Sequence, residues 1–255
     1  MGKKCNDLAD VKRTQDTLFD GRLFCLQHAD GYRFSIDPVL LAHFVRLGKD
    51  ENVLDLGAGC GILGLILLYR AGNRIRSLTA FELQAGLAEL ARDNIKLNQF
   101  QNQMQVMEGD LCDIKKSLKP EAYSTVVCNP PFYPLGGGRP SCNKESEIAR
   151  HQVTCTLADV LKAAATAVKN RGRIYLIYPA DGLGSLFALL PQQGLTAKRL
   201  QLIYSYPDTE TGARLLLLEA MKNGGEGLEV LPPFYIYDKK NGNYSEAMQQ
   251  LYESS

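Results

Sequence analysis

The residues most suggestive of chemistry follow a short apolar run, Val126–Cys128, that is typical of the end of a buried strand. The next four residues are Asn129, Pro130, Pro131 and Phe132. Asn129 offers a side-chain carbonyl and Pro130 a backbone carbonyl, and the prolines fix φ so that both acceptors are rigid. Phe132 can stack on a flat substrate, as in enzymes that act on flipped bases.

This set of groups is typical of a site that activates an amino or amide nitrogen whose lone pair is delocalised into a π-system. Acceptors aimed at its N–H protons favour the tetrahedral nitrogen that attacks, and rigid acceptors need little reorganisation. With an activated alkyl donor the gain is mainly alignment, so neither a strong base nor a metal is expected. We expect Asn129, Pro130, Pro131 and Phe132 to be catalytic, with Phe132 and Tyr133 contacting the substrate. The alternative is a rigid strand exit with a packed aromatic ring.

A second candidate site is the run D-L-G-A-G-C-G, in which Gly57, Gly59 and Gly61 follow Asp55. Glycines allow a tight turn and let the backbone approach a ligand closely. The run lies between an expected strand and an expected helix, where open α/β sheets bind ligands. A plain strand-to-helix turn would also account for the run taken alone.

The same loop is compatible with a dinucleotide site, because Gly59, Gly61 and Gly64 match G-x-G-x-x-G and Glu82 ends the next strand. Asp55 argues against it, since a carboxylate repels a pyrophosphate and attracts a sulfonium and an α-amino group. The loop therefore favours S-adenosylmethionine over a nicotinamide cofactor, and an oxidoreductase is a distant alternative.

Alternating strands and helices are expected to position these residues, in an α/β fold with a mostly parallel twisted sheet and helices on both faces. The expected strands are Val53–Leu56, Ser77–Glu82, Met104–Glu108, Ser124–Cys128 and Arg173–Tyr178. The expected helices are Gly61–Arg70, Gln84–Asn98, Leu157–Val168 and Gly182–Gln192. Two later strands, near Leu200–Tyr206 and Ala213–Met221, have no helix between them and predict an antiparallel edge pair.

Three regions are expected along the chain. Residues 1–50 form an amino-terminal extension, with hairpin turns at Asp20-Gly21 and Asp30-Gly31 and a helix that Asp37 would cap. Residues 51–222 form the main domain, and residues 223–255 a strand-like tail packed on it. The tail repeats P-P-F-Y, but Leu231 stands where the amide should be, which indicates a structural edge segment.

Taken together, D-L-G-A-G-C-G, N-P-P-F, Q-H-A-D-G-Y-R-F-S-I-D-P and the closing L-P-P-F-Y-I-Y-D resemble the tRNA (adenine-N6) methyltransferase family acting on valine tRNA. The resemblance covers roughly residues 17–252. It implies a Rossmann-like class I methyltransferase fold and S-adenosylmethionine as cofactor. It also implies methylation of an exocyclic adenine N6 in tRNA, next to the anticodon.

The resemblance also implies roles for individual residues. Asp55 would lie near the cofactor's amino group, Glu82 would accept from both ribose hydroxyls, and Asp110 would accept from the adenine amino group. The full expected cofactor set is Ser35, Asp37, Asp55, Gly57, Gly59, Gly61, Glu82, Leu83, Asp110, Leu111 and Asn129. Ser35 and Asp37 could equally serve only to cap the following helix.

The substrate side is expected in the glycine-rich segment after the N-P-P-F motif, where Arg139, Lys144 and Arg150 suit phosphates. A solvated loop is the plain alternative for each of them. The formal net charge is only +1, so affinity for RNA would come from a local patch. Other targets stay open: the glutamine N5 of a release factor, guanine N2 in RNA, or a scaffold that only binds cofactor and RNA.

The seven cysteines contain no C-x-x-C pair, and no apolar run approaches the length of a membrane span. We therefore expect a reduced cytoplasmic protein with no metal and no membrane partner, and the sequence leaves the oligomeric state open. Cys60 and Cys128 are expected to be packed thiols beside the site.

Overall fold

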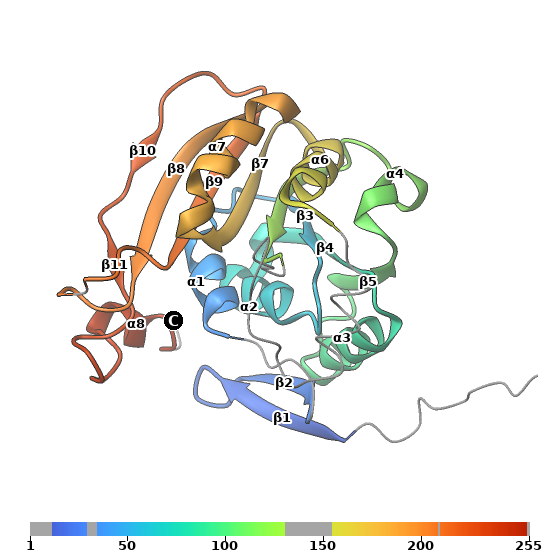
Figure 1. Ribbon diagram of the computed structural model, residues 1–255. Coiled ribbons are helices and arrows are strands. Elements are labelled where there is room, and N and C mark those ends of the chain that lie inside the picture. The colour runs from blue at the N-terminus through green and yellow to red at the C-terminus, as the bar shows by residue number, and fades with distance from the viewer. Residues whose placement is uncertain (1–11, 30–34, 131–154, 209, 254–255) are drawn as a thin grey trace, which may run out of the picture.

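The computed structural model describes residues 12–29, 35–130, 155–208 and 210–253, and a mixed sheet of nine strands forms its centre (Figure 1). The strands nearest the site are β3 Glu51–Leu56, β4 Ile75–Glu82, β5 Met104–Glu108, β6 Tyr123–Cys128 and β7 Val168–Pro179. The others are β8 Leu195–Tyr204, β9 Leu215–Lys222, β10 Glu229–Val230 and β11 Phe234–Tyr235. Their spatial order is β10-β8-β9-β7-β6-β3-β4-β5, with β11 also paired to β8.

Strand β3 lies at the topological switch point of the sheet, where the chain begins to add strands on the opposite side. It pairs in parallel with β4 on one side and β6 on the other, so that β4 and β5 extend one half and β6 and β7 the other. Ligands of open α/β sheets bind at such a point, outside the carboxyl ends of the strands. The predicted parallel sheet is confirmed, and it brings the ends of β3 and β6 together.

Strand β9 pairs antiparallel with both β7 and β8, which confirms the predicted antiparallel edge. The tail then returns along β8, because β10 and β11 both pair with β8 in parallel. Phe234 and Tyr235 of the second P-P-F-Y copy therefore form an edge segment, as expected from Leu231. The tail ends in the short helix α8 Glu246–Gln250.

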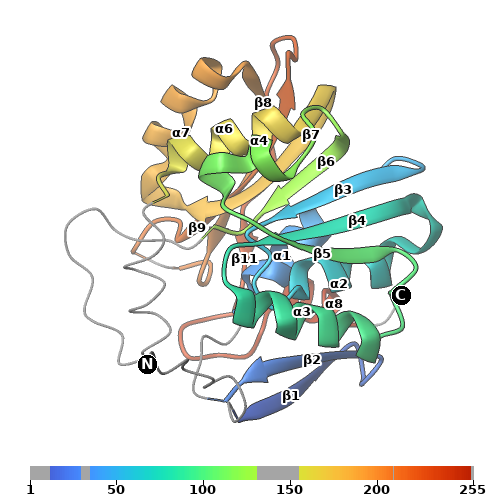
Figure 2. The ribbon, with the colours of Figure 1, turned by 90° about the vertical axis from the view of Figure 1, so that its right-hand side faces the viewer.

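Helices cover both faces of the sheet (Figure 2). One face carries α1 Asp37–Phe44, α2 Ile62–Ala71 and α3 Ala85–Leu97; the other carries α4 Ile114–Ser117, α6 Leu157–Ala167 and α7 Leu183–Leu189. Each face buries its own apolar cluster, since Val53 belongs to the first and its neighbour Leu54 to the second. This alternation is the period-two pattern of a strand buried on both sides. None of the helices in the described ranges is long and apolar enough to cross a membrane.

The amino-terminal hairpin, β1 Arg13–Leu18 with β2 Leu23–His28, packs on α3 (Figure 2). Its turn at Asp20-Gly21 confirms the prediction, whereas the predicted turn at Asp30-Gly31 lies outside the described residues. The prediction that Asp37 caps α1 is wrong: Ile36 occupies the cap position, and Asp37 is the first helical residue. Ser35 supplies the local hydrogen bond instead, its Oγ accepting from the Asp37 backbone N–H at 3.2 Å.

Candidate functional site

The carboxyl ends of four neighbouring strands carry the predicted polar residues to one edge of the sheet. Asp55 is the last residue but one of β3, Glu82 ends β4, and Asp110 follows β5 by two residues. Asn129 directly follows β6. In the sheet register Asp55 lies opposite Val127, so the glycine loop and Asn129 leave neighbouring strands at the same level.

The glycine loop adopts backbone conformations that a side chain would strain. Gly57, Gly59 and Gly61 have φ of 76°, 57° and 85°. A Cβ built on Gly57 or Gly59 would meet no atom within 4 Å, so their exposed sides are open to a ligand. Gly61 differs, because its Cβ would lie 3.3 Å from Ala91 Cβ of α3. Gly61 thus permits close packing of the start of α2 on α3.

Glu82 is held in place by the loop that it borders. Its two carboxylate oxygens accept from the backbone N–H groups of Gly59 at 2.8 Å and Gln84 at 2.9 Å. Burial raises the pKa of Glu82, although these backbone hydrogen bonds oppose the rise. Each oxygen can accept a further hydrogen bond, so the carboxylate remains able to receive a pair of hydroxyl donors.

Asp55 is the most deeply buried acid of the site, with only 1% of its surface exposed. Its Oδ2 accepts from the backbone N–H of Gly64 at 3.2 Å, which ties β3 to the first turn of α2. Burial raises the pKa of Asp55 to about 7, and the negative charge of Glu82 adds to the rise. At neutral pH, this carboxyl group therefore divides its population between the acid and the carboxylate.

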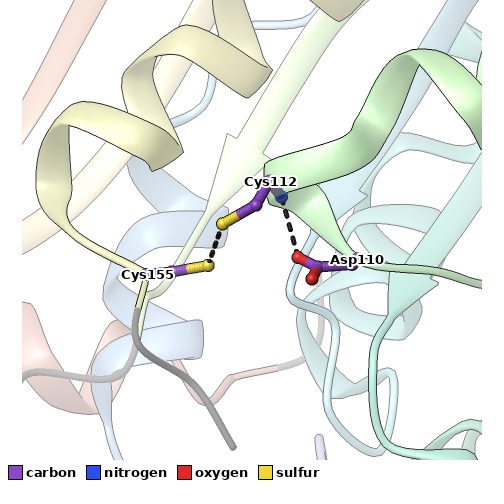
Figure 3. Close-up of side chains that lie close together, drawn as sticks. All are labelled: Asp110, Cys112 and Cys155. Carbon is purple, nitrogen blue, oxygen red and sulfur yellow. Dashed lines mark hydrogen bonds between the residues drawn. The ribbon is translucent and has the colours of Figure 1, made fainter.

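Asp110 lies at the exposed end of β5, where its Oδ1 accepts from the Cys112 backbone N–H at 2.8 Å (Figure 3). This hydrogen bond caps a short 3₁₀ turn, Leu111–Asp113. Leu111 is half-buried, and Leu83, after the end of β4, is 38% exposed. The two leucines give this part of the edge apolar surface beside the carboxylates.

Asn129 is half-buried and Pro130 is buried, directly after the last hydrogen-bonded residue of β6. Cys128 Sγ donates to the Leu56 carbonyl at 3.1 Å, which holds the ends of β6 and β3 together beneath the site. Burial raises the pKa of Cys128, so its thiol stays protonated. A buried, protonated thiol that donates to the backbone agrees with the expected packing role.

The structure adds a hollow of about 450 Å³ that the sequence did not indicate. It lies beyond the end of β7, and its lining includes Pro179, Tyr206 and Arg214. Burial raises the pKa of Asp37, while the positive charge of Arg214 opposes that rise, so the guanidinium acts across to the start of α1.

A second residue missed by sequence reasoning is Asn94, fully buried on α3. Its side-chain amide donates to the carbonyls of Leu26 and Cys60, and its Oδ1 accepts from the Leu26 N–H. It thereby connects the amino-terminal hairpin to the glycine loop. An asparagine on the otherwise apolar face of α3 could have indicated a buried structural role from the sequence. Nothing in the sequence around Arg214 indicated its place in the hollow.

The remaining predicted residues lie outside the described ranges. They are Pro131, Phe132, Tyr133, Arg139, Lys144 and Arg150. Their roles stay predictions.

The described part of the site has the character of a binding site for a cation. Asp55, Glu82 and Asp110 bring three carboxyl groups to adjoining strand ends. Within the described ranges, none of them forms an ion pair with a lysine or arginine. A cationic ligand would reduce the repulsion between them, whereas a pyrophosphate would increase it. Together with the open glycine loop, these residues fit S-adenosylmethionine.

Several sequence relatives of the chain carry the same name. The tRNA1(Val) (adenine(37)-N6)-methyltransferase of Shewanella sp. (strain MR-4) is 27% identical over 227 residues, which cover 87% of this chain and 90% of the relative. The enzyme of the same name from Phocaeicola vulgatus is 28% identical over 180 residues, covering 71% of this chain and 74% of the relative.

Solved structures support the fold. A predicted O-methyltransferase from Agrobacterium tumefaciens matches with a TM-score of 0.67 at 21% identity, covering 84% of this chain and 94% of that one. TYW2 from M. jannaschii, solved in complex with AdoMet, matches with a TM-score of 0.56 at 15% identity, covering 84% of this chain and 87% of that one. Both likenesses concern the fold alone.

The family model described as the methyltransferase small domain matches residues 35–179. This range begins at Ser35, includes the glycine loop and Asn129, and ends at the last residue of β7. It spans more than half of the 255 residues. The chain therefore belongs to the methyltransferase small domain family.

Proposed function

We propose that this protein transfers a methyl group from S-adenosylmethionine to the exocyclic N6 of an adenine in tRNA, next to the anticodon. The observation that carries the proposal is the placement of Asn129 and Pro130 beside the glycine loop, on the neighbouring strand and at the same level. The names of the relatives supply the choice of tRNA and of adenine N6. Such an enzyme would act in the cytoplasm, where its substrate is found.

The cofactor supplies a methyl group activated by a sulfonium, and the residues of the chain would hold it by charge and hydrogen bonding. We assign Asp55 to the amino group, Glu82 to the ribose hydroxyls and Asp110 to the adenine amino group. Carboxylate oxygens accept such donors well, and charge-assisted hydrogen bonds are stronger than neutral ones. Leu83 and Leu111 would contact the adenine ring, and Gly57 and Gly59 leave room for the ligand.

The substrate amino group is a poor nucleophile because its lone pair is delocalised into the adenine ring. Asn129 Oδ1 and the Pro130 carbonyl would accept its two N–H protons and favour the tetrahedral nitrogen. Pro130 is buried and its ring fixes φ, so these acceptors are held before the substrate arrives. Phe132 would stack on the base, which an unpaired loop adenosine can present at low cost.

We assign the hollow beyond the end of β7 to RNA next to the target base. Arg214 is exposed on its lining and Tyr206 is half-buried there, a cation and an aromatic ring suited to a phosphate and a base. Arg139, Lys144 and Arg150 would extend the basic surface.

Asn129→Ala tests the chemical assignment. The variant should bind S-adenosylmethionine within a few-fold of the parent protein, because the cofactor acids are untouched. Its turnover with tRNA should fall by ~10²-fold or more, as on loss of one preorganised electrostatic contact. Calorimetry measures the first quantity and labelled-methyl transfer the second. Normal turnover by Asn129→Ala would remove the basis of the mechanism.

A further inference from the structure

Two cysteines from distant parts of the chain lie together beside Asp110 (Figure 3). Cys112 belongs to the 3₁₀ turn after β5, and Cys155 precedes Thr156, the capping residue of α6. Their sulfur atoms are 2.7 Å apart although the residues are separated by 43 positions. Cys112 is exposed and Cys155 is partly exposed, so small molecules in solvent can reach the pair.

A disulfide requires the two sulfur atoms to lie about 2.05 Å apart. From 2.7 Å the approach still needed is about 0.7 Å, which small side-chain rotations can supply. The Cys25–Cys60 pair serves as a comparison within the same protein. Its sulfur atoms are 3.8 Å apart, and Cys25 is fully buried. Distance and access therefore both single out Cys112 and Cys155.

The same pair could be considered as part of a metal site, because Asp110 also brings a carboxylate oxygen within 4.8 Å of both sulfurs. Structural zinc sites use four ligands in a closed tetrahedron. The described residues offer three ligands, and Asp110 Oδ1 already accepts a hydrogen bond from the Cys112 backbone N–H. The geometry therefore favours a bond between the sulfurs over a shared cation.

We propose that Cys112 and Cys155 form a redox-active dithiol that low-molecular-weight disulfides convert into an intramolecular disulfide. The Cys112 thiolate attacks one sulfur of the small disulfide, forming a mixed disulfide and expelling one small thiolate. The Cys155 thiolate then attacks the Cys112 sulfur and expels the second. The two cysteine sulfurs are oxidised, the two sulfurs of the small disulfide are reduced, and the two protein protons end on the two small thiols.

Thiol chemistry predicts a strong pH dependence for this reaction. Partial burial raises the pKa of Cys112, and burial together with the contact to Cys112 raises the pKa of Cys155 to about 12. Because the thiolate is the attacking species, oxidation should be slow at neutral pH and faster in mildly alkaline buffer.

The disulfide would restrain one part of the proposed site. It would fix the turn that carries Asp110 to Cys155, directly before the capping residue of α6. Because the Cys112 N–H donates to Asp110, which is assigned to the adenine amino group of the cofactor, oxidation should lower methyl transfer to tRNA, and reduction should restore it. This consequence rests on the proposed function, whereas formation of the disulfide does not.

The test uses the whole protein, reduced, freed of reductant, and incubated with glutathione disulfide at pH 8. Remaining thiols are alkylated, and the linked peptides are identified by mass spectrometry. We expect a Cys112–Cys155 linkage, with Cys25 and Cys60 unlinked, and a glutathione adduct on Cys112 in the Cys155→Ser variant. A bond from Cys112 to Cys142, a persistent mixed disulfide in the parent protein, or protection of both thiols by Zn²⁺ carried through purification would overturn the proposal.

Methyl transfer is measured on the same samples to test the consequence for activity. Loss of transfer in the oxidised parent protein, its return with dithiothreitol, and no response in the Cys112→Ser/Cys155→Ser double variant would support it. If the linkage forms and transfer is unchanged, the disulfide stands and its effect on the site is refuted. If no preparation transfers a methyl group, the proposed function fails while the linkage result remains valid.

Discussion

Asp55 makes cofactor binding depend on pH in a way that can be calculated. Its pKa of about 7 in the cofactor-free protein is raised mainly by burial. If the carboxylate form binds the cationic cofactor, the apparent affinity follows the ionised fraction, which is about 3% at pH 5.5 and 50% at pH 7. The association constant should therefore rise roughly 15-fold over this range, or about 1.6 kcal/mol. An α-amino group, with an ordinary pKa of about 7.7–8.0, stays largely protonated throughout.

The assay is titration calorimetry of S-adenosylmethionine at several pH values between 5.5 and 7. Asp55→Asn keeps an oxygen that can accept from the Gly64 N–H but cannot ionise, so its affinity should be lower at pH 7 and vary less with pH. Asp50→Asn is the matched control, because Asp50 precedes the opposite end of β3 and pairs there with Arg76. Equal pH dependence in the parent protein and Asp55→Asn would refute the reasoning.

Asp55 also affects the stability of the fold, and its effect on stability changes with pH in the direction opposite to its effect on cofactor binding. The pKa in the folded state lies above the ordinary value of 3.8, so the folded protein binds more protons between about pH 4 and pH 7. The contribution of Asp55 to stability therefore falls as pH rises through this window, by up to about 4 kcal/mol at 1.36 kcal/mol per unit. Asp55→Asn should accordingly raise the unfolding temperature of the cofactor-free protein at pH 8 while weakening cofactor binding.

Two other substitutions test the substrate side and the packing under the site. Arg214→Ala should raise the KM for tRNA and make that KM less dependent on salt, while cofactor affinity stays unchanged. Arg171→Ala, at the far end of β7, is the control and should leave the KM for tRNA and its salt dependence unchanged in the same steady-state assay. Gly109→Ala would place a Cβ 2.6 Å from the buried Phe81 ring and should destabilise by about 1–3 kcal/mol in denaturant titrations. Gly184→Ala, in α7 with nothing within 4 Å, should be neutral or stabilising, and the reverse order would contradict the packing argument.

Much of the fold follows from local patterns in the sequence. Strand β5 was predicted with its observed bounds, Met104–Glu108, and α3 was predicted to within one residue at each end. The first residues of β7 were missed, because Val168 was predicted to end a helix and Lys169–Gly172 is polar. Val168 pairs with Tyr123 of β6, the register then shifts, and pairing with β9 begins at Arg173, so the start of β7 depends on tertiary context.

The features of the site also fall into two groups, those that the sequence could predict and those that depend on tertiary packing. Asp55, Glu82, Asp110 and Asn129 could be placed together because each lies at or just after the carboxyl end of a strand in a parallel sheet. The contacts of Asn94, the hollow beside Arg214 and the approach of Cys112 to Cys155 depend on how distant segments pack. No spacing rule links Cys112 and Cys155 across 43 positions, so only the structure could bring them together.

The central claim is tested most directly by methyl transfer itself. The purified protein is incubated with methyl-labelled S-adenosylmethionine and, separately, with tRNA, rRNA and a release-factor fraction, and each product is hydrolysed and identified. We predict label in tRNA as N6-methyladenosine, in the nucleoside next to the anticodon, and its loss with Asn129→Ala. Label in the glutamine of a release factor, or in N2-methylguanosine, with none in tRNA adenine, would contradict the account.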